Sequence, residues 1–145
     1  MKLALIGYGA MGQLVASLAR AAGDEIGATL TSKDSARSID EMAALLRGQD
    51  VAVDFSIGSA VVTHVEACMH AGVPLVQGTT GWKDHETDAR RIVGEHTGEL
   101  PPSVLYATVT KARELYKAGR VLADVSRLRR VITAISSRCR GQQVQ

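Results

Sequence analysis

Short apolar runs alternate with longer stretches of mixed apolar and polar residues over most of the chain. The apolar runs have the length and composition of buried β-strands and span residues 2–6, 25–31, 51–55, 74–77 and 103–107. Between them, apolar residues recur every three or four positions, a spacing that predicts helices over residues 13–22, 38–47, 59–71 and 84–96. Ser38 and Glu41 have the spacing of a capping box, and a glycine follows each of the first three predicted helices.

This alternation of strands and helices predicts an α/β fold. Parallel strands joined by helices form a sheet that is covered on both faces, because each crossover lays a helix on the sheet. Right-handed crossovers then favour a doubly wound, Rossmann-like parallel sheet of about five strands in the order 3-2-1-4-5. We therefore expect one domain over residues 1–107, followed by a segment of different character.

Charge divides the chain at nearly the same point. Residues 1–102 hold 8 Lys and Arg against 13 Asp and Glu, a net charge of −5, whereas residues 103–145 hold 9 against 2, a net charge of +7. Apolar residues within 108–145 recur at helical spacing, so we expect a basic tail, helical or disordered, in place of a second domain. Three hypotheses fit this tail: a nucleic-acid-binding surface, a helix that covers the sheet or pairs with another subunit, or the product of an altered reading frame or truncated gene. The abrupt change of pattern favours the third.

Composition narrows the possible functions. Aromatic residues make up only 3% of the chain, which argues against the stacking platforms of nucleic-acid-binding proteins. Two cysteines without a Cys-x-x-Cys motif indicate neither a disulfide framework nor zinc or redox chemistry. No apolar run approaches the roughly 18 residues that a membrane-spanning helix needs. We expect a cytoplasmic protein with neither a nucleic-acid nor a membrane partner.

A glycine motif stands between the first predicted strand and the first predicted helix. Residues 7–12, Gly-Tyr-Gly-Ala-Met-Gly, have the G-x-G-x-x-G pattern in the context of a dinucleotide-binding loop. Gly7 would permit the tight turn, Gly9 the approach of a pyrophosphate, and Gly12 the close packing of helix on strand. Backbone N–H groups and the helix dipole would hold the anion. The predicted cofactor-binding residues are Gly7, Tyr8, Gly9, Ala10, Met11 and Gly12.

The residues after the second predicted strand bear on the choice of cofactor. An NAD site places an Asp or Glu about 20 residues beyond the glycine loop, where it binds the ribose 2′-hydroxyl. Here Thr31, Ser32 and Lys33 stand at that place, and the first acid is Asp34. Hydroxyl groups and a lysine suit a 2′-phosphate better than a bare ribose. We expect NADP(H) to be favoured over NAD(H), with Ser32 and Lys33 at the phosphate.

Three segments together carry a resemblance to a known family. They are the glycine loop, Val-Asp-Phe-Ser at 53–56, and Val-Gln-Gly-Thr-Thr-Gly at 76–81. In combination they resemble the dihydrodipicolinate reductase family (4-hydroxy-tetrahydrodipicolinate reductase), over residues 1–107. The resemblance implies NAD(P)H-dependent reduction of 4-hydroxy-tetrahydrodipicolinate in lysine and diaminopimelate biosynthesis. It also implies that Phe55, Gly78, Thr79 and Thr80 line the nicotinamide side.

The resemblance ends after residue 107. The family continues into a substrate domain with a His-His and Lys motif and a Ser-Gly-Thr loop, and no His-His pair occurs in this chain. We therefore assign no catalytic residue, and expect a small-molecule substrate only if the missing half is supplied. Two other hypotheses stay open. The chain could be a non-catalytic NAD(P)-binding module whose tail binds a partner, or a fragment of another Rossmann oxidoreductase.

Other polar residues have structural explanations. His64, Cys68 and His70 share one predicted helix, but no further ligand stands at metal-binding spacing, so we predict no metal site. Cys68 is expected to be buried. Asp54 ends a buried strand, where we expect its carboxylate to cap a neighbouring loop or helix rather than to act as a general base. Trp82 is expected to pack on its loop.

Overall fold

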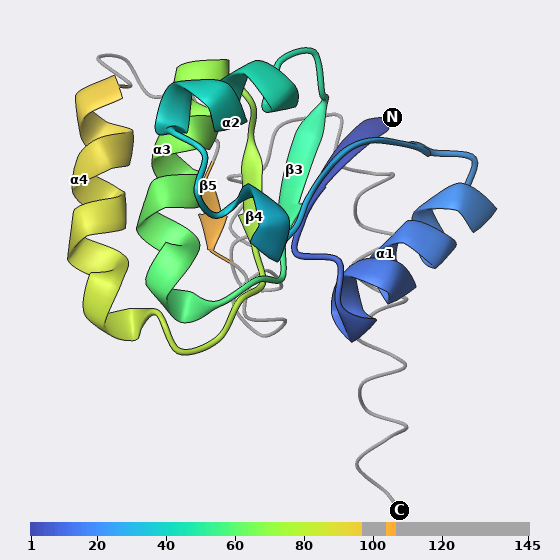
Figure 1. Ribbon diagram of the computed structural model, residues 1–145, viewed down its shortest axis with the longest axis horizontal. Helices are drawn as coiled ribbons and strands as arrows, with labels where there is room; N and C mark the ends of the chain where they lie inside the picture. The colour runs from blue at the N-terminus through green and yellow to red at the C-terminus, as the bar shows by residue number, and fades with distance from the viewer. Residues whose placement is uncertain (97–103, 107–145) are drawn as a thin grey trace, which may run out of the picture.

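Five parallel strands form one sheet in the computed structural model, in the order β2-β1-β3-β4-β5 (Figure 1). The strands are β1 (Lys2–Ile6), β2 (Glu25–Leu30), β3 (Val51–Asp54), β4 (Leu75–Gln77) and β5 (Val104–Tyr106). The structure describes residues 1–96 and 104–106, so the predicted basic tail over 108–145 lies outside the described residues. The predicted α/β class with a parallel, Rossmann-like sheet is confirmed.

Four α-helices connect and cover these strands. They are α1 (Ala10–Ala21), α2 (Ile39–Leu46), α3 (Val61–Ala71) and α4 (Glu86–His96). Each overlaps a predicted helix, but α1 begins at Ala10, within the glycine motif of residues 7–12, rather than at residue 13. Short 3₁₀ turns at Gly58–Ala60 and Lys83–His85 lead into α3 and α4. The capping box of α2 is confirmed, because Ser38 Oγ accepts from the Glu41 N–H at 3.3 Å and Glu41 accepts from the Ser38 N–H at 2.8 Å.

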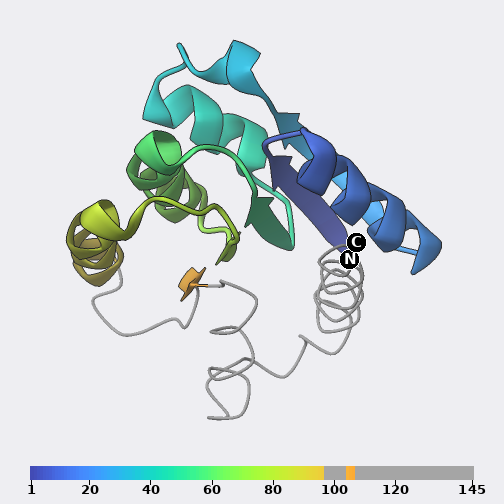
Figure 2. The same ribbon diagram turned by 90° about the horizontal axis from the view of Figure 1, so that it is seen from below.

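The predicted strand order 3-2-1-4-5 is wrong: β1, and not β2, is the neighbour of β3. Leu3 pairs with Val51 and Ile6 with Asp54 in a parallel register. Both orders allow right-handed crossovers, and with that handedness the position of β3 determines the face of the sheet on which α2 packs. In the structure α2 packs beside α3, and α3 beside α4, on the face opposite α1 (Figure 2). The apolar stripe of α2 shows that one side of this helix is buried, but it does not encode the face of the sheet that it covers.

Two layers of buried side chains lie on the two faces of the sheet. β1 divides its residues between them: Ala4 and Ile6 belong to the layer under α2, α3 and α4, and Leu3 and Leu5 to the layer under α1. This alternation follows from the pleat, which turns successive side chains to opposite faces. Since both faces are covered over β1, a ligand can approach this strand only at its end. The chain reverses direction across the sheet at β1 and β3, and such a switch point opens a crevice at the carboxyl ends of the strands.

The remaining structural expectations concern single residues and the surface. Cys68 is fully buried, which raises the pKa of its thiol to about 12, and Trp82 packs against the layer under α3 and α4 as predicted.

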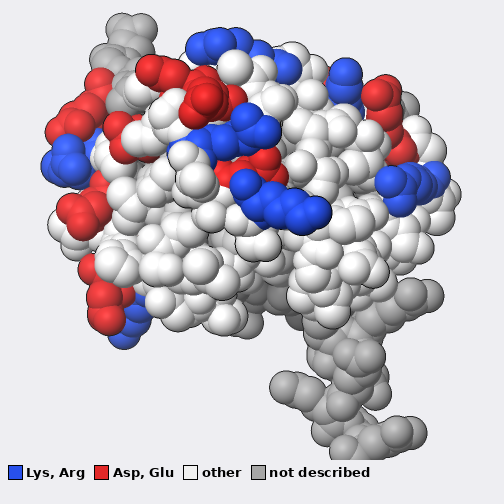
Figure 3. All heavy atoms as spheres, viewed as in Figure 1, with Lys and Arg blue, Asp and Glu red and all other residues white. Residues whose placement is uncertain are grey.

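None of the helices in the described residues is long and apolar enough to span a membrane. On the face seen in Figure 1, acidic and basic side chains of the described residues are interspersed (Figure 3).

Candidate functional site

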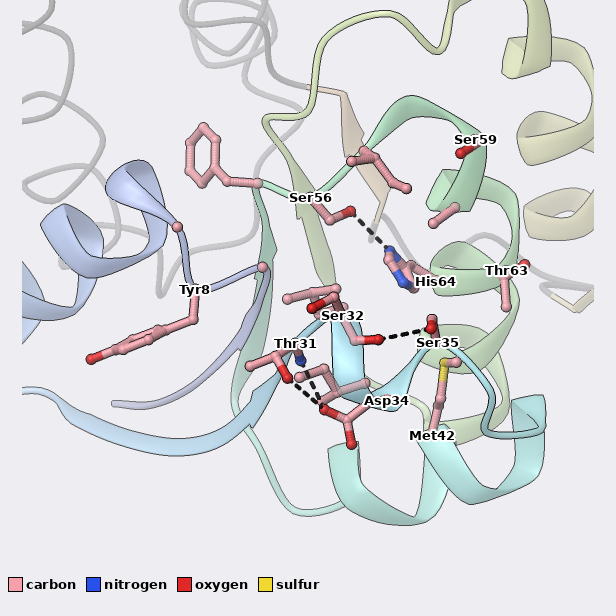
Figure 4. Close-up of a pocket in the computed structure, with 17 residues that line it drawn as sticks. Tyr8, Thr31, Ser32, Asp34, Ser35, Met42, Ser56, Ser59, Thr63 and His64 are labelled. Atoms are coloured by element: carbon pink, nitrogen blue, oxygen red, sulfur yellow. Dashed lines mark hydrogen bonds between the residues drawn. The ribbon is translucent and has the colours of Figure 1, made fainter.

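A cavity of about 760 Å³ opens at the carboxyl ends of β1, β2 and β3 (Figure 4). Its wall is built from the segments that follow these three strands, together with the start of α3 and one side chain of α2. The lining residues are Ile6, Gly7, Tyr8, Gly9, Leu30, Thr31, Ser32, Asp34, Ser35, Met42, Phe55, Ser56, Ile57, Ser59, Ala60, Thr63 and His64. The cavity therefore lies at the switch point that the topology creates, and its size falls within the usual range for small-molecule sites.

The glycine loop forms one side of this cavity through its backbone. Gly7 has a φ of +88°, which residues with side chains rarely adopt, and a Cβ there would collide with the carbonyl group of Phe55. A Cβ on Gly12 would collide with the Gly7 carbonyl, so the close packing predicted for Gly12 is against the loop itself rather than the strand. A Cβ on Gly9, in contrast, would meet nothing within 4 Å.

The start of α1 is open to a ligand. Gly9 is the N-cap of the helix and no side chain caps it, so the first N–H groups of the helix keep their hydrogen-bonding capacity. No acidic side chain stands in the first turn, which leaves the positive end of the helix dipole uncompensated there. Tyr8 and Gly9 line the cavity, while Ala10, Met11 and Gly12 form the first turn of α1. An anion of phosphate type fits this arrangement.

The segment after β2 folds around Asp34. Its carboxylate accepts hydrogen bonds from the Thr31 N–H at 2.8 Å and from Arg37 Nε at 2.7 Å. The hydrogen bond from Arg37, followed by that from Thr31, holds the pKa of Asp34 below its ordinary value. Ser32 lines the cavity, whereas Lys33 is exposed and lies outside the lining. Arg37 was not predicted as a site residue, although its spacing of three residues from Asp34 could have indicated the pair.

The segment after β3 is organised by a fully buried carboxylate. Asp54 Oδ1 accepts from the Ser56 N–H at 2.8 Å and from Thr79 Oγ1 at 3.1 Å, and Asp54 Oδ2 lies 2.9 Å from His64 Nδ1. Burial by itself would raise the pKa of Asp54, but the hydrogen bond and charge of His64, with the bonds from Ser56, outweigh it and lower the pKa. The predicted capping role of Asp54 is confirmed by its bond to Ser56.

The residues expected on the nicotinamide side lie around Phe55. Its ring covers Gly78, where a Cβ would collide with ring atoms, and Phe55 itself lines the cavity. Thr79 is buried, and its hydroxyl accepts from the Ser56 N–H at 2.9 Å as well as bonding to Asp54. Thr80 is exposed. Gly78 therefore stands behind the Phe55 ring, and Gly78, Thr79 and Thr80 are not in the wall of this cavity.

His64 is the main site residue that the sequence did not indicate. It lies on α3, ten residues after Asp54, and the two side chains meet only because α3 crosses back over the end of β3. No local motif encodes that contact. Within residues 1–96 and 104–106, no group of three or more His, Cys, Asp or Glu is placed to hold a metal ion. The chemistry of the cavity is therefore that of hydroxyl groups, one imidazole, one paired carboxylate and free backbone N–H groups.

Comparison with known proteins gives a consistent set of relatives. The family model described as "Dihydrodipicolinate reductase, N-terminus" matches residues 1–100. Three curated proteins named 4-hydroxy-tetrahydrodipicolinate reductase are similar to this chain. The protein of Christiangramia forsetii is 33% identical over 92 residues, that of Thermomicrobium roseum 45% over 76, and that of Beutenbergia cavernae 39% over 90. These matches cover 63%, 51% and 62% of this chain, but only 36%, 29% and 34% of the relatives. The chain thus matches about a third of the length of each relative.

Proposed function

Because the chain belongs to the dihydrodipicolinate reductase family, we propose that its cavity binds a nicotinamide dinucleotide and that the chain is the cofactor-binding part of a reductase. The open start of α1 beside Gly9 carries this proposal. A pyrophosphate there would accept hydrogen bonds from the first N–H groups of the helix, with no side chain in the way. When bound, the nicotinamide supplies a hydride to the substrate.

The two halves of the dinucleotide would extend to opposite sides of the glycine loop. The adenosine half would occupy the cavity between the segments after β2 and β3, since the ribose of such cofactors binds at the end of β2. The nicotinamide half would extend past Phe55 toward Gly78, Thr79 and Thr80. Phe55 stands at the boundary between the two halves, with its ring on Gly78 and its carbonyl against Gly7.

Titration calorimetry of Gly9→Val tests the pyrophosphate site. The side chain would occupy the space in front of the helix N-terminus, so we expect the affinity for NADPH to fall at least about tenfold, the loss of one or more charge-assisted hydrogen bonds. Stability should change little, because a Cβ at Gly9 has open space around it. Gly94→Val is the matched control, since Gly94 on α4 has equally open surroundings outside the cavity. Equal affinity of Gly9→Val and Gly94→Val would contradict the proposal.

A preference for NADP(H) over NAD(H) is a further part of the proposal. Ser32 lines the cavity, and the cations closest to it in sequence are Lys33 and Arg37. Arg37 is bound to Asp34, which compensates a carboxylate that would otherwise repel a 2′-phosphate. We expect Lys33→Ala to lower the ratio of NADPH to NADH affinity about threefold to tenfold, the contribution of one exposed cation to a phosphate. An unchanged ratio would indicate that Arg37, rather than Lys33, contacts the 2′-phosphate. Arg37→Ala tests that alternative by the same measurement.

The reaction that we propose for the complete system is the one named for the relatives, reduction of 4-hydroxy-tetrahydrodipicolinate. The resemblance implies that the family's substrate-binding residues, which include a His-His pair, lie beyond the matched region. The four histidines of this chain stand at 64, 70, 85 and 96, so none forms such a pair. Orientation of a bound acceptor can contribute about 7–11 kcal/mol to such a step. We therefore expect these 145 residues to bind NADPH but to oxidise it negligibly with this substrate, as followed by absorbance at 340 nm. A rate within about tenfold of an intact relative would mean that the chain completes its own active site.

A further inference from the structure

The two faces of the sheet are covered unequally. On one face, the buried layer contains side chains of α2, α3 and α4. On the other face, the helix residues of the buried layer in the described part of the chain all belong to α1: Val15, Ala16 and Ala19. The strand residues of this second layer are Leu3 and Leu5 of β1, Val51 and Val53 of β3, and Val76 of β4. Three helices thus share one face, and a single described helix lies on the other.

α1 is too narrow to cover all of these strands. Neighbouring strands lie about 4.8 Å apart and a helix is about 10 Å wide, so one helix covers about two strands. α1 packs on β2 and β1, at one end of the sheet (Figures 1 and 2). The valines of β3 and β4 therefore lie beyond α1, on the side toward β5.

These valines are nevertheless buried within the single chain. Val51, Val53 and Val76 are 3%, 4% and 5% exposed, and no second molecule contributes to those values. A fully buried residue contacts about 6–12 others, which neighbours in the sheet alone do not supply. Residues 97–103 have to join the end of α4 to the start of β5. The cover for β3 and β4 must therefore come from residues 107–145.

The chain leaves the described sheet beside this face. Its last described residues form β5, the neighbour of β4, and the opposite face already carries α3 and α4. Within the basic tail, apolar residues recur at helical spacing: Leu122, Val125, Leu128, Ile132 and Ile135. A helix over 122–135 would be about 21 Å long, enough to cross a five-residue strand of about 17 Å.

We propose that residues 122–135 form an amphipathic helix that packs on β3 and β4 beside α1, with its apolar stripe on Val53 and Val76. Ala123, Arg127 and Arg130 then fall on the solvent side of the helix. Charge favours contact within one chain, because residues 1–102 carry a net −5 and residues 103–145 a net +7. Two copies of the tail would repel each other. The inference does not depend on the proposed function.

The test places a nitroxide spin label on this helix in the full chain. Ala123→Cys with Cys139→Ser leaves one reactive thiol, because the remaining cysteine, Cys68, is fully buried. We expect the label to broaden the methyl NMR signals of Val53 and Val76 about tenfold more than that of Val65, which lies a further layer of about 10 Å away, under α3. Equal broadening on both faces, or none, would overturn the proposal.

Two neighbouring substitutions in the labelled chain test the apolar stripe. Leu128→Asp places a charge in the stripe and should abolish the broadening of Val53 and Val76. Arg127→Asp places the same charge on the opposite side of the helix and should leave that broadening unchanged. Loss of the broadening in both variants, or in neither, would overturn the proposal.

A mixed sample distinguishes the chain's own tail from that of a second copy. One chain carries the spin label without an isotope, and the other carries the isotope without a spin label. We expect no broadening of Val53 or Val76 in this mixture. Broadening there would assign the face to the tail of a second copy and overturn the proposal.

A measurement on the wild type covers the case in which the labelled variant does not fold. Nuclear Overhauser effects between methyl groups report direct contact between side chains. We expect them between Val76 and the leucine and isoleucine methyls of residues 122–135. Effects from Val53 and Val76 to residues 1–106 alone would overturn the proposal.

Discussion

The loop after β1 and the segment after β3 meet at the same cavity, but they are built in opposite ways. The first has its shape because side chains are absent: Gly7 lies against the Phe55 carbonyl, and Gly12 against the Gly7 carbonyl. The second is held by side chains that satisfy one another, with Asp54 bonded to Ser56, Thr79 and His64. Close backbone contact leaves no room for an added atom, whereas a hydrogen-bond network depends on which polar atoms are present. The two regions should therefore respond to different kinds of substitution.

The largest effect should come from adding one methyl group to the glycine loop. Gly7→Ala combines a left-handed φ with a collision against the Phe55 backbone, and we expect a loss of about 2–4 kcal/mol in the free energy of unfolding. Gly9→Ala is the control two residues away, with open space and an ordinary φ of −77°, and should cost no more than about 1 kcal/mol. Urea denaturation followed by circular dichroism measures both. Similar losses in the two variants would mean that contact with Phe55 does not shape the loop.

A change of charge without a change of shape tests the region after β3. In Asp54→Asn one oxygen can still accept from Ser56, but the other position becomes an NH₂ group that faces the Nδ1–H of His64. We expect a loss of about 1–3 kcal/mol at pH 7, the cost of a buried polar group that is left unpaired.

The same substitution predicts a pH dependence with a definite sign. The pKa of Asp54 is lowered in the folded protein from its ordinary value of 3.8, so its stabilisation is fully present above that value. It is lost as the pH falls through the lowered folded pKa. The difference in unfolding free energy between wild type and Asp54→Asn should therefore shrink below about pH 4. A difference that stays constant down to pH 2 would show that the carboxylate charge is not what Asp54 contributes.

The smallest effect should come from the Thr79 hydroxyl, which joins the segment after β4 to the segment after β3. Thr79→Val keeps the volume but removes the bonds to Asp54 and Ser56, and we expect a loss of about 1 kcal/mol. Thr79→Ser keeps the hydroxyl and removes one methyl group from a buried site, so its loss should be near the cost of that group alone, also about 1 kcal/mol. Thr79→Val alone removes one of the two acceptors of the Ser56 N–H beside the cavity and leaves Asp54 Oδ1 as the other, so the two variants should differ in affinity for NADPH. Equal affinities would confine the role of Thr79 to packing.

The parts of the structure differ in how well the sequence predicted them. The turn at Gly7 and the capping box at Ser38 depend on residues a few positions apart, and both are present as expected. The contact between Asp54 and His64 depends on how α3 crosses the end of β3, which no spacing encodes. Lys33 is exposed outside the cavity wall, because it lies in a 3₁₀ turn after β2, Ser32–Asp34, which sets the direction of each side chain there.

The strand order shows the same limit at a larger scale. The buried stripe of α2, which includes Met42 and Leu46, correctly indicates a helix with one apolar face. The same stripe would suit packing beside α1 or beside α3, and that choice alone distinguishes 3-2-1-4-5 from the observed order. It depends on the fit between whole surfaces and not on any property of the helix by itself.

The network around Asp54 has a consequence for the order in which the chain folds. Its hydrogen bonds join residues separated by 2 to 25 positions, all within the continuous segment from Asp54 at the end of β3 to Thr79, just after β4. The contact of Gly7 with Phe55 closes a loop roughly twice as long as the longest loop in this network. Closing it costs more chain entropy, and that entropy is lost before the contact can stabilise the fold. We expect the β3-α3-β4 unit to reach native-like structure first and the glycine loop to close onto it afterwards. The turn at Gly7 would then be the last part of the cavity to form.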